Sequence, residues 1–507
     1  MTAPKPGKFL ARVSPDEARR RLLEDVGPLP CESISIDAAC GRITAAAIYA
    51  IHDAPHYRAS AMDGIAVRAA DTFEATPEQP VTLGLPPASG PGCAEIDTGG
   101  VLPDWADAVV RIEDVRREPD GFSLRCAVAP GHDVRRAGED IDKGSRLLPR
   151  GARITPWDLG ALIAAGIVNI NVVARPRLAI LPTGSEVTEP IADPAPGQVL
   201  EYNGRMIEAA AVAVGIQVTR LAIVADDQSK LERAVADAAA NYDAVAVIAG
   251  SSVGRRDLTV DVLAKLGDVL AHGVDMMPGK PVSIARIGNT PIVGIPGYPV
   301  SAIVAAEQLL APLLAKLAGV LETGPERVQA RIGRKIPSRL GVEEFRRVCL
   351  CRHESGFVVA PLPRGAGAVS TAARAHGWLR IGPTSEGVDA DAEVTIDLIR
   401  SSAEALTTVV IAGAPDRDSA ALEDDLRANG HVLRMVWLGN SQDDAVEALV
   451  AGEAHAAVFG VDDPALMRVA QRLPEIERRD LNENSVMVVA PFAATLPNFD
   501  LILGRRQ

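Results

Sequence analysis

The 507-residue sequence is poor in aromatic side chains and in positive charge. Aromatic residues make up only 3% of it, so its cores must be built mainly from Ala, Val, Leu and Ile. The formal net charge of −14 excludes a protein that holds nucleic acid or an anionic membrane by bulk electrostatics. An anionic ligand would need local donors strong enough to offset this field.

The sequence also lacks CxxC pairs, an N-terminal signal segment and a long apolar run. Its six cysteines are scattered. The stretch Cys349-Leu-Cys351-Arg-His353 could suggest a metal site, but alternate residues of a strand share one face, so we expect a buried sheet face instead. No run approaches the ~18–20 apolar residues of a membrane span. These absences predict a cytoplasmic protein with reduced thiols and no membrane partner.

What the sequence does contain predicts several folded domains. At about 100–200 residues per domain, the length corresponds to three to five, and 47% hydrophobic with 23% charged residues is typical of globular chains. The fold class is a multidomain α/β and β protein with the following parts: a helical and linker domain (1–29 and 146–172), an inserted β-rich module (30–145), a Rossmann-like α/β domain with a mainly parallel sheet (173–322), a small β-barrel (323–402) and an appended, lysine-free α/β lobe (403–507).

The α/β domain alternates apolar β-branched runs with helical patterns. Its strands end in glycine turns, as in "RLAILPTGSEV" and "AVAVIAGSS". Ligands of parallel sheets bind at the carboxyl ends of the strands, where these turns lie. Two Pro-Gly corners, Pro278-Gly279-Lys280 and Pro296-Gly297-Tyr298-Pro299, enclose the strand "PIVGI" and are followed by groups suited to an oxyanion, Lys280 and Ser301.

Several loops carry candidate functional residues, each with a second interpretation. Gly250-Ser251-Ser252-Val253-Gly254 opens a helix and suits a phosphate, but it also fits the GxSxG elbow of hydrolases, with His272, His353 or His376 as base, or a plain turn. Thr183-Gly184-Ser185-Glu186 offers a carboxylate to a metal or only to a helix dipole. Asp63, Glu139 and Asp140 beside glycines could equally be turn formers.

The order of these motifs resembles a known family. "SAMDGIAVR", "DTGGVLPDWADAVVRIEDV", "RRAGEDI", "PRLAILPTGSEV", "EYN", "GSSVGRRD", "PGKPVS" and "IPGYPVSA" are similar in sequence and spacing to the molybdopterin molybdenumtransferases, which include the gephyrin E domain. The resemblance covers roughly residues 8–400. It implies insertion of molybdate into adenylylated molybdopterin, with release of AMP and a need for Mg²⁺.

The resemblance also implies a homodimer whose site is shared between subunits. Molybdopterin adenylyltransferase or molybdoenzyme apoproteins are further partners that it implies. By the resemblance, Asp257, Asp140 and Asp63 match catalytic positions of the family, and Asp257 and Glu186 match its metal-binding positions. The matched substrate-binding residues are Thr183, Gly184, Glu186, Asn203, Gly250, Ser252, Gly254, Lys280, Ser301, Arg347 and Ser370. With no protein nucleophile required, Ser252 becomes part of a phosphate cradle.

The sequence departs from the family pattern at Ser251, Arg255, Arg256, Met277, Tyr298 and Ile65. Tyr298 replaces the usual Asn of Pro-Gly-Asn-Pro, so the corner there is expected to differ in shape. These departures motivate an alternative, a non-catalytic scaffold that binds or senses molybdopterin or molybdate. A stand-alone adenylyltransferase is a weaker alternative, because that activity belongs to the α/β domain alone. The C-terminal residues resemble one lobe of a periplasmic-binding-protein or LysR effector fold, too short for a complete ligand cleft.

Overall fold

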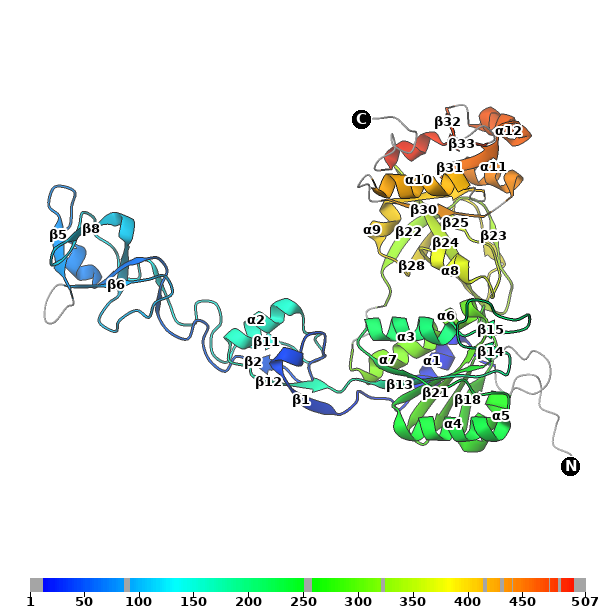
Figure 1. Cartoon of the computed structure of the whole chain (residues 1–507), viewed down its shortest axis with the longest axis horizontal. Coiled ribbons are helices and arrows are strands. Elements are labelled where there is room, and N and C mark those ends of the chain that lie inside the picture. The colour runs from blue at the N-terminus through cyan, green and yellow to red at the C-terminus, as the bar shows by residue number, and fades with distance from the viewer. Residues whose placement is uncertain are drawn as a thin grey trace. The chain divides into compact units, whose positions relative to one another are not determined.

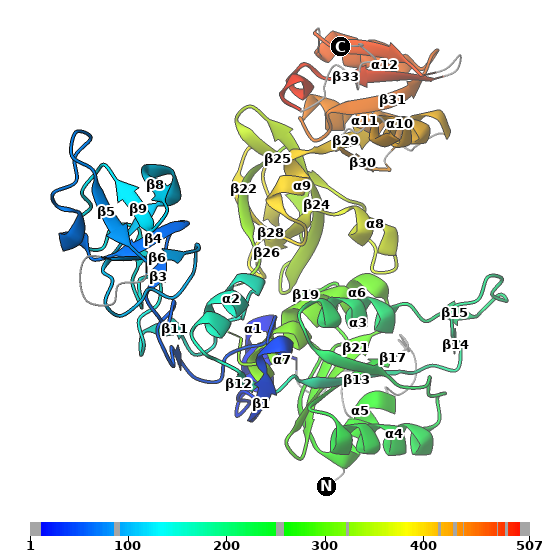
Figure 2. The ribbon, with the colours of Figure 1, turned by 60° about the vertical axis from the view of Figure 1, so that its left-hand side comes forward.

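A computed structural model describes residues 12–85, 92–249, 258–320, 324–413, 417–428, 433–439, 441–473, 475–481 and 485–496. The chain forms two compact units (Figures 1 and 2). The larger contains residues 1–27, 176–317 and 322–507, and the smaller contains residues 28–175 and 318–321. The chain is therefore a multidomain α/β and β protein.

The smaller unit is built from short strands and one main helix. Antiparallel three-stranded sheets β6-β4-β7 and β5-β9-β8 stand beside the pairs β1-β12, β10-β3 and β11-β2. The elements are β1 (Cys31–Ser35), η1 (Ile36–Ala38), β2 (Ile48–Tyr49), β3 (Ala59–Ser60), β4 (Gly64–Val67), η2 (Ala69–Thr72), β5 (Val81–Gly84), β6 (Cys93–Ile96), β7 (Ala108–Arg111), η3 (Ile112–Asp114), β8 (Val115–Glu118), β9 (Gly121–Leu124), β10 (Val134–Arg135), β11 (Arg146–Leu148), α2 (Pro156–Ala164) and β12 (Asn169–Val173).

Local interactions start and stop the helix α2. Thr155 and Asp158 form a reciprocal capping box, Pro156 occupies the first turn, and Gly166 follows the helix with φ +88°. Its Leu162 packs with Ile36 and Val172 in one hydrophobic cluster, so residues 156–172 share a core with η1 and the β1–β12 pair.

The larger unit begins with the α/β domain (residues 176–317), whose six-stranded sheet has the order β16-β13-β17-β21-β20-β18. The first four strands are parallel, and β20 and β18 are antiparallel additions. The strands are β13 (Arg177–Pro182), β16 (Gln217–Arg220), β17 (Ala244–Ala249), β18 (Asp268–His272), β20 (Ser283–Ile287) and β21 (Thr290–Pro296), with the short pair β14 (Val187–Thr188) and β15 (Val199–Leu200) outside the sheet.

Helices cover both faces of this sheet (Figure 1). On one face lie α4 (Gln228–Asn241) and α5 (Leu258–Leu266), whose buried Leu231, Val235 and Leu263 pack on Leu181 and Val247 of the strands. The other face carries α3 (Asn203–Ala213), α6 (Pro299–Ala305), the π-helical turn η4 (Ala306–Leu310) and α7 (Ala311–Leu317). The strands are buried on both faces and accordingly read as continuous apolar runs.

The segment Pro299–Leu317 is the one described helix that is long and apolar enough, by length and composition, to span a membrane. No stretch of this kind is expected from the sequence. In the structure 61% of the helix is buried, because it packs on β21 and α1. It is the core helix of the α/β domain.

The N-terminal helix α1 (Pro15–Leu23) belongs to this larger unit. Ser14 caps it, with its Oγ accepting from Glu17 N at 3.2 Å, and its Arg19 donates to Gln308 O of η4 at 3.1 Å. The sequence groups residues 1–29 with residues 146–172, whereas the structure divides these segments between the two units. Burial of the apolar face of α1 against η4 and α7 causes the difference.

Residues 324–400 form a closed five-stranded barrel, since β24 pairs with both β25 and β26 in the order β24-β25-β22-β28-β26. Its elements are β22 (Arg327–Ile332), β23 (Ile336–Pro337), β24 (Glu343–His353), β25 (Gly356–Pro361), α8 (Val369–Arg374), β26 (Gly377–Ile381), β27 (Gly387–Val388) and β28 (Glu393–Leu398). The short β19 (Met276–Met277) of the α/β domain extends it by pairing with β24.

The lobe (residues 402–496) has a five-stranded sheet of order β30-β29-β31-β33-β32. Its elements are α9 (Ser402–Leu406), β29 (Thr408–Ala412), α10 (Arg417–Ala428), β30 (Arg434–Trp437), α11 (Gln442–Val450), β31 (Ala456–Gly460), α12 (Pro464–Arg472), β32 (Glu477–Asp480), β33 (Ser485–Val489) and η5 (Pro491–Thr495). The lobe is α/β as expected, and its resemblance to half of a two-lobed binding fold stays a prediction.

The lobe is not a separate module, contrary to the sequence interpretation. Cys349 and Cys351 of β24 are fully buried in one hydrophobic cluster with Val410, Leu449 and Val488 of the lobe. The cysteines thus form the buried sheet face that strand alternation predicts, and burial raises the pKa of Cys349 to about 12. Among the described residues, no group of three or more His, Cys, Asp or Glu could hold a metal ion.

Candidate functional site

The carboxyl ends of β13, β17 and β21 meet at one edge of the α/β sheet, because these strands are parallel neighbours. Thr183 ties the first loop to the second strand: its N–H and Oγ1 both donate to Ile248 O, at 2.8 and 3.0 Å. The loop after β17, with the candidates Gly250, Ser252, Gly254 and Asp257, lies outside the described residues.

Glu186 offers an exposed carboxylate beside the loop after β13. Gly184 has φ +134°, and a Cβ placed there would come within 3.1 Å of both carboxylate oxygens of Glu186. Glycine is thus required both by the backbone and by the close approach of this side chain. The neighbouring Ser185 exchanges hydrogen bonds with Asp226, at 3.3 and 3.1 Å, which fixes the loop against the segment after β16.

Asn203, the first residue of α3, joins the helix to the second Pro-Gly corner. Its Nδ2 donates to Gly297 O at 2.7 Å, while its Oδ1 is buried and has no hydrogen-bond partner among the described residues. A buried amide oxygen normally has a partner, so this atom is an acceptor available to a ligand donor.

An ion pair beside Asn203, between Glu201 and Arg205, was not predicted from the sequence. Glu201 is 4% exposed, and its carboxylate accepts from Gly204 N at 2.6 Å and from Arg205 Nη1 at 2.7 Å. The i,i+4 spacing of Glu201 and Arg205 at the start of a helix is the signal that could have revealed it. The pair fixes the N-terminus of α3 that positions Asn203.

The second corner contacts the barrel. Tyr298 is the N-cap of α6 with φ −70°, and it makes no side-chain cap bond. The left-handed conformation that Asn would favour is therefore not used at this position. Two residues further on, Val300 N donates to Ala366 O of the barrel at 2.9 Å.

The first corner also meets the barrel. Gly279 has φ +117°, and Met276 and Met277 pair in parallel with Glu343 and Glu344 of β24. Lys280 is half-buried just after this turn. Both Pro-Gly corners thus connect the α/β sheet to the barrel. They enclose the two antiparallel strands β20 and β21, and not the single strand that the sequence predicts.

Among the remaining candidates, Arg347 is used within the barrel. It is 5% exposed, and its guanidinium donates to Thr371 Oγ1 at 2.6 Å and to Pro363 O at 3.0 Å. Burial, and then the charge of Arg346, lower its pKa to about 10. In this arrangement Arg347 fixes the loop that precedes α8. Ser370, within α8, is exposed. Ser301 is buried in the first turn of α6.

The other two acidic candidates lie in the smaller unit. Asp63 Oδ1 accepts from Thr98 N at 2.6 Å and from Thr98 Oγ1 at 2.7 Å, and these bonds lower the pKa of Asp63. Asp140 is exposed, and its backbone N–H donates to Ala54 O at 3.1 Å. No hydrogen bond or ion pair between described residues joins Asp63 to Asp140, because the antiparallel β3–β10 pair carries their segments away in opposite directions.

The hydrolase interpretation loses two of its three candidate bases. His376 accepts from Leu350 N and contacts Thr408 Oγ1, and His353 contacts Gly452 O and stacks on Phe492. Both imidazoles are thus engaged between the barrel and the lobe.

Three consecutive segments match known sequence families. Residues 13–166 match the "MoeA N-terminal region (domain I and II)", residues 179–316 a "Probable molybdopterin binding domain", and residues 329–399 the "MoeA C-terminal region (domain IV)". The three matched ranges end before the lobe begins.

Individual relatives agree with these matches. Molybdopterin molybdenumtransferase 2 of Mycobacterium tuberculosis is 32% identical over 369 residues, which cover 69% of this chain and 90% of the relative. Molybdopterin molybdenumtransferase of Bacillus subtilis is 30% identical over 407 residues, or 76% and 94%. A molybdopterin biosynthesis MoeA protein of Pyrococcus horikoshii has a solved structure with a TM-score of 0.66 and 32% identity, covering 77% of this chain and 100% of that chain. The chain belongs to the molybdopterin molybdenumtransferase family.

Proposed function

We propose that the protein is an enzyme of molybdenum cofactor biosynthesis that inserts molybdate into adenylylated molybdopterin and releases AMP. The observation that carries the proposal is the ordered match of three consecutive family segments, one of them a molybdopterin-binding domain. The six cysteines without disulfides suit a reaction in the reducing cytoplasm.

The sheet edge supplies chemistry suited to these substrates. Both are anionic, so the ammonium group of Lys280, half-buried just after the first Pro-Gly corner, would offset their repulsion. The unpaired Oδ1 of Asn203 would accept a hydrogen bond from the pterin or ribose of the substrate. Arg347 would not contact the substrate itself but would position the loop that lies beside Tyr298.

Among the described residues, Glu186 fits the kind of Mg²⁺ site that the family implies. Magnesium is commonly held by one or two carboxylates, with substrate phosphates and waters completing the shell. Glu186, exposed at the end of the first sheet strand, would supply one carboxylate, and Asp257 would supply a second. The ion would polarise the phosphoanhydride from which AMP leaves.

We also propose a homodimer in which Asp63 and Asp140 reach the α/β domain of the partner subunit. Both are exposed, and the hydrogen bonds from Thr98 hold Asp63 ionised and oriented, as a group that contacts a metal or a phosphate-bound water must be.

A reconstituted assay tests the main proposal. Purified protein is mixed with adenylylated molybdopterin, molybdate and Mg²⁺, and AMP is measured by chromatography. We expect AMP release that requires all three additions. Absence of AMP from well-folded protein would reject the enzymatic function. Competition between molybdate and tungstate in the same assay would identify the preferred oxyanion, since the two have nearly the same size and charge.

One observation supports a second candidate, a non-catalytic binder of molybdopterin. Tyr298 is 49% exposed at the corner where the family pattern usually has a short amide, and a phenol cannot offer the same hydrogen bonds. Saturable molybdopterin binding without AMP release would favour this function over the enzyme.

A further inference from the structure

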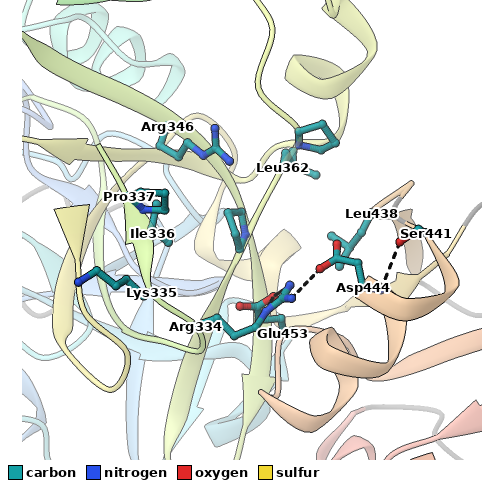
Figure 3. Close-up of a pocket in the computed structure, with 12 residues that line it drawn as sticks. Arg334, Lys335, Ile336, Pro337, Arg346, Leu362, Leu438, Ser441, Asp444 and Glu453 are labelled. Atoms are coloured by element: carbon teal, nitrogen blue, oxygen red, sulfur yellow. Dashed lines mark hydrogen bonds and ion pairs between the residues drawn. The ribbon is translucent and has the colours of Figure 1, made fainter. Parts of the chain in front are cut away.

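A cavity of about 500 Å³ lies where the lobe packs on the barrel (Figure 3). Its volume falls within the range of roughly 300–1,000 Å³ that is usual for small-molecule sites. The barrel supplies Arg334, Lys335, Ile336, Pro337, Arg346, Pro361, Leu362 and Pro363, and the lobe supplies Leu438, Ser441, Asp444 and Glu453. The three segments that match the family end at residue 399, so the lobe's contribution is outside them.

The two walls of this cavity are firmly joined. Arg334 of the barrel donates to Asp444 at 2.6 Å and to Glu453 at 2.5 Å, both in the lobe. Behind these contacts, the fully buried Cys351 and Leu449 belong to the hydrophobic cluster shared by barrel and lobe. The cavity is therefore a built feature of the larger unit.

One cation in the cavity lacks hydrogen-bond acceptors. Arg334 is satisfied by the two lobe carboxylates, and Lys335 pairs with Asp389 at 2.8 Å. Arg346, by contrast, has a buried Nε and Nη1 without any hydrogen-bond partner among the described residues.

Nearby carboxylates do not satisfy Arg346. Its nearest one, Glu344, lies 4.0 Å away and already accepts from Ser338 Oγ at 2.8 Å and pairs with Arg364 at 3.2 Å. Burial, and then the charge of Arg364, lower the pKa of Arg346. Buried guanidinium donors without acceptors are costly, and an anion against the part of this guanidinium that lines the cavity would offset its buried charge.

The rest of the lining is mainly apolar. Proline rings at 337, 361 and 363 and the side chains of Ile336, Leu362 and Leu438 form its walls. A bare inorganic oxyanion would leave these walls in contact with water, whereas an apolar body would bury them. We propose that this cavity binds a small organic carboxylate, with the carboxylate on Arg346 and a ring or short aliphatic body against the prolines and leucines.

Such a ligand would contact barrel and lobe at once. Any molecule that binds the joined arrangement and not the separated one stabilises the joint by mass action. Carboxylate binding is thus expected to raise the temperature at which the lobe separates from the barrel. The lobe would then serve as a sensor of an organic acid attached to the family's three segments.

Isothermal titration of the full-length protein with benzoate, 1-naphthoate and 4-methylvalerate tests the proposal. Benzamide, inorganic phosphate and molybdate serve as probes that lack either the charge or the apolar body. We expect saturable binding of at least one carboxylate, about tenfold or more tighter than benzamide, because only the carboxylate gives Arg346 a charged acceptor. Phosphate and molybdate are expected not to displace it.

Variants assign the effect to the cavity. Arg346→Gln should weaken carboxylate binding about tenfold or more, and Arg346→Lys, which keeps the charge but loses the planar fork, should weaken it less. Arg331→Gln is the matched control, since this exposed β22 arginine pairs with Asp391 and does not line the cavity. Circular dichroism verifies that each variant is folded.

Three outcomes would overturn the proposal. The first is folded wild-type protein that binds none of the three carboxylates, and the second is equal binding by the Arg346→Gln and Arg331→Gln variants. The third is displacement of the carboxylate by phosphate or molybdate at equal concentration, which would make the cavity an inorganic oxyanion site.

Discussion

Lowering the pH from 7 to 5 is predicted to loosen the contact between the barrel and the lobe, through two buried histidines. His376 Nδ1 accepts from Leu350 N at 2.9 Å, and His455 Nδ1 accepts from Val410 N at 2.9 Å. The neutral ring of His376 therefore carries its proton on Nε2, which contacts Thr408 Oγ1, whereas Nε2 of His455 lies 3.1 Å from Arg352 N and 3.2 Å from Arg352 O. Protonation of Nδ1 would set two N–H groups against each other in a fully buried position.

The magnitude follows from the pKa values. Burial is the main cause that lowers the pKa of both His376 and His455 to about 3, from an ordinary 6.5. Below pH 6.5 the unfolded chain binds protons that the folded chain does not, so stability falls as the pH falls. Between pH 7 and 5 the loss is about 2 kcal/mol for each histidine, or about 4 kcal/mol together. This is a large part of the roughly 5–15 kcal/mol that stabilises a typical domain.

Urea unfolding at pH 7 and pH 5, followed by circular dichroism, measures the total loss. Hydrogen exchange with mass spectrometry, corrected for the intrinsic pH effect, should show faster exchange in peptides that contain Leu350 and Val410. Replacing both histidines with Gln removes their titration and should reduce the pH-dependent loss. The exposed His132→Gln variant should behave as wild type. An equal loss in wild type and in the double variant would refute the reasoning.

Three further predictions concern the proposed site and the core helix. Glu186→Gln should lower AMP release at least about tenfold with an unchanged circular dichroism spectrum, because a metal-holding carboxylate is lost; undiminished release would remove Glu186 from the site. If Asp63 acts in the partner's site, mixing the inactive Glu186→Gln and Asp63→Asn proteins should restore AMP release. Half of the randomly mixed dimers would then carry one intact site of two, so the recovery would be up to about a quarter of the wild-type value. No recovery despite verified subunit exchange would contradict a shared site. Burial raises the pKa of Glu307 to about 7, so the folded chain keeps a proton that the unfolded chain loses above pH 4.5, and stability falls as the pH rises. Glu307→Gln should therefore raise the melting temperature more at pH 8 than at pH 5, and equal shifts at both pH values would argue against a buried carboxyl.

The signals that start and end single helices are local and can be read from the sequence. The cap at Ser14, Pro156 in the first turn of α2 and the turn at Gly166 are each encoded within a few residues, and the structure contains all three. The candidate residues at the sheet edge followed from motif order. Thr183, Asn203 and Lys280 do lie at strand ends, turns or helix starts, as that order predicts.

The contacts that each candidate residue makes were harder to predict than its position on a strand end, turn or helix start. Asn203 was a candidate for its place in a motif, but its bond to Gly297 O and its unpaired Oδ1 arise from residues 94 positions apart. The grouping of α1 likewise could not be read locally. A short amphipathic helix can pack against several apolar surfaces. In the folded chain, α1 packs against the helical segments η4 and α7, and this contact could not be read from its own residues.

The sequence by itself determined which residues are available to each face of a strand, because side chains alternate with a period of two. It could not determine what each face meets. Arg346 and Arg347 are adjacent and chemically identical, yet Arg347 donates to Thr371 and Pro363, while Arg346 lines a cavity and has two buried donors without a hydrogen-bond partner among the described residues. Tertiary structure decided this difference, since the docking of a lobe about a hundred residues further along the chain closes one face of the barrel and leaves a space beside it.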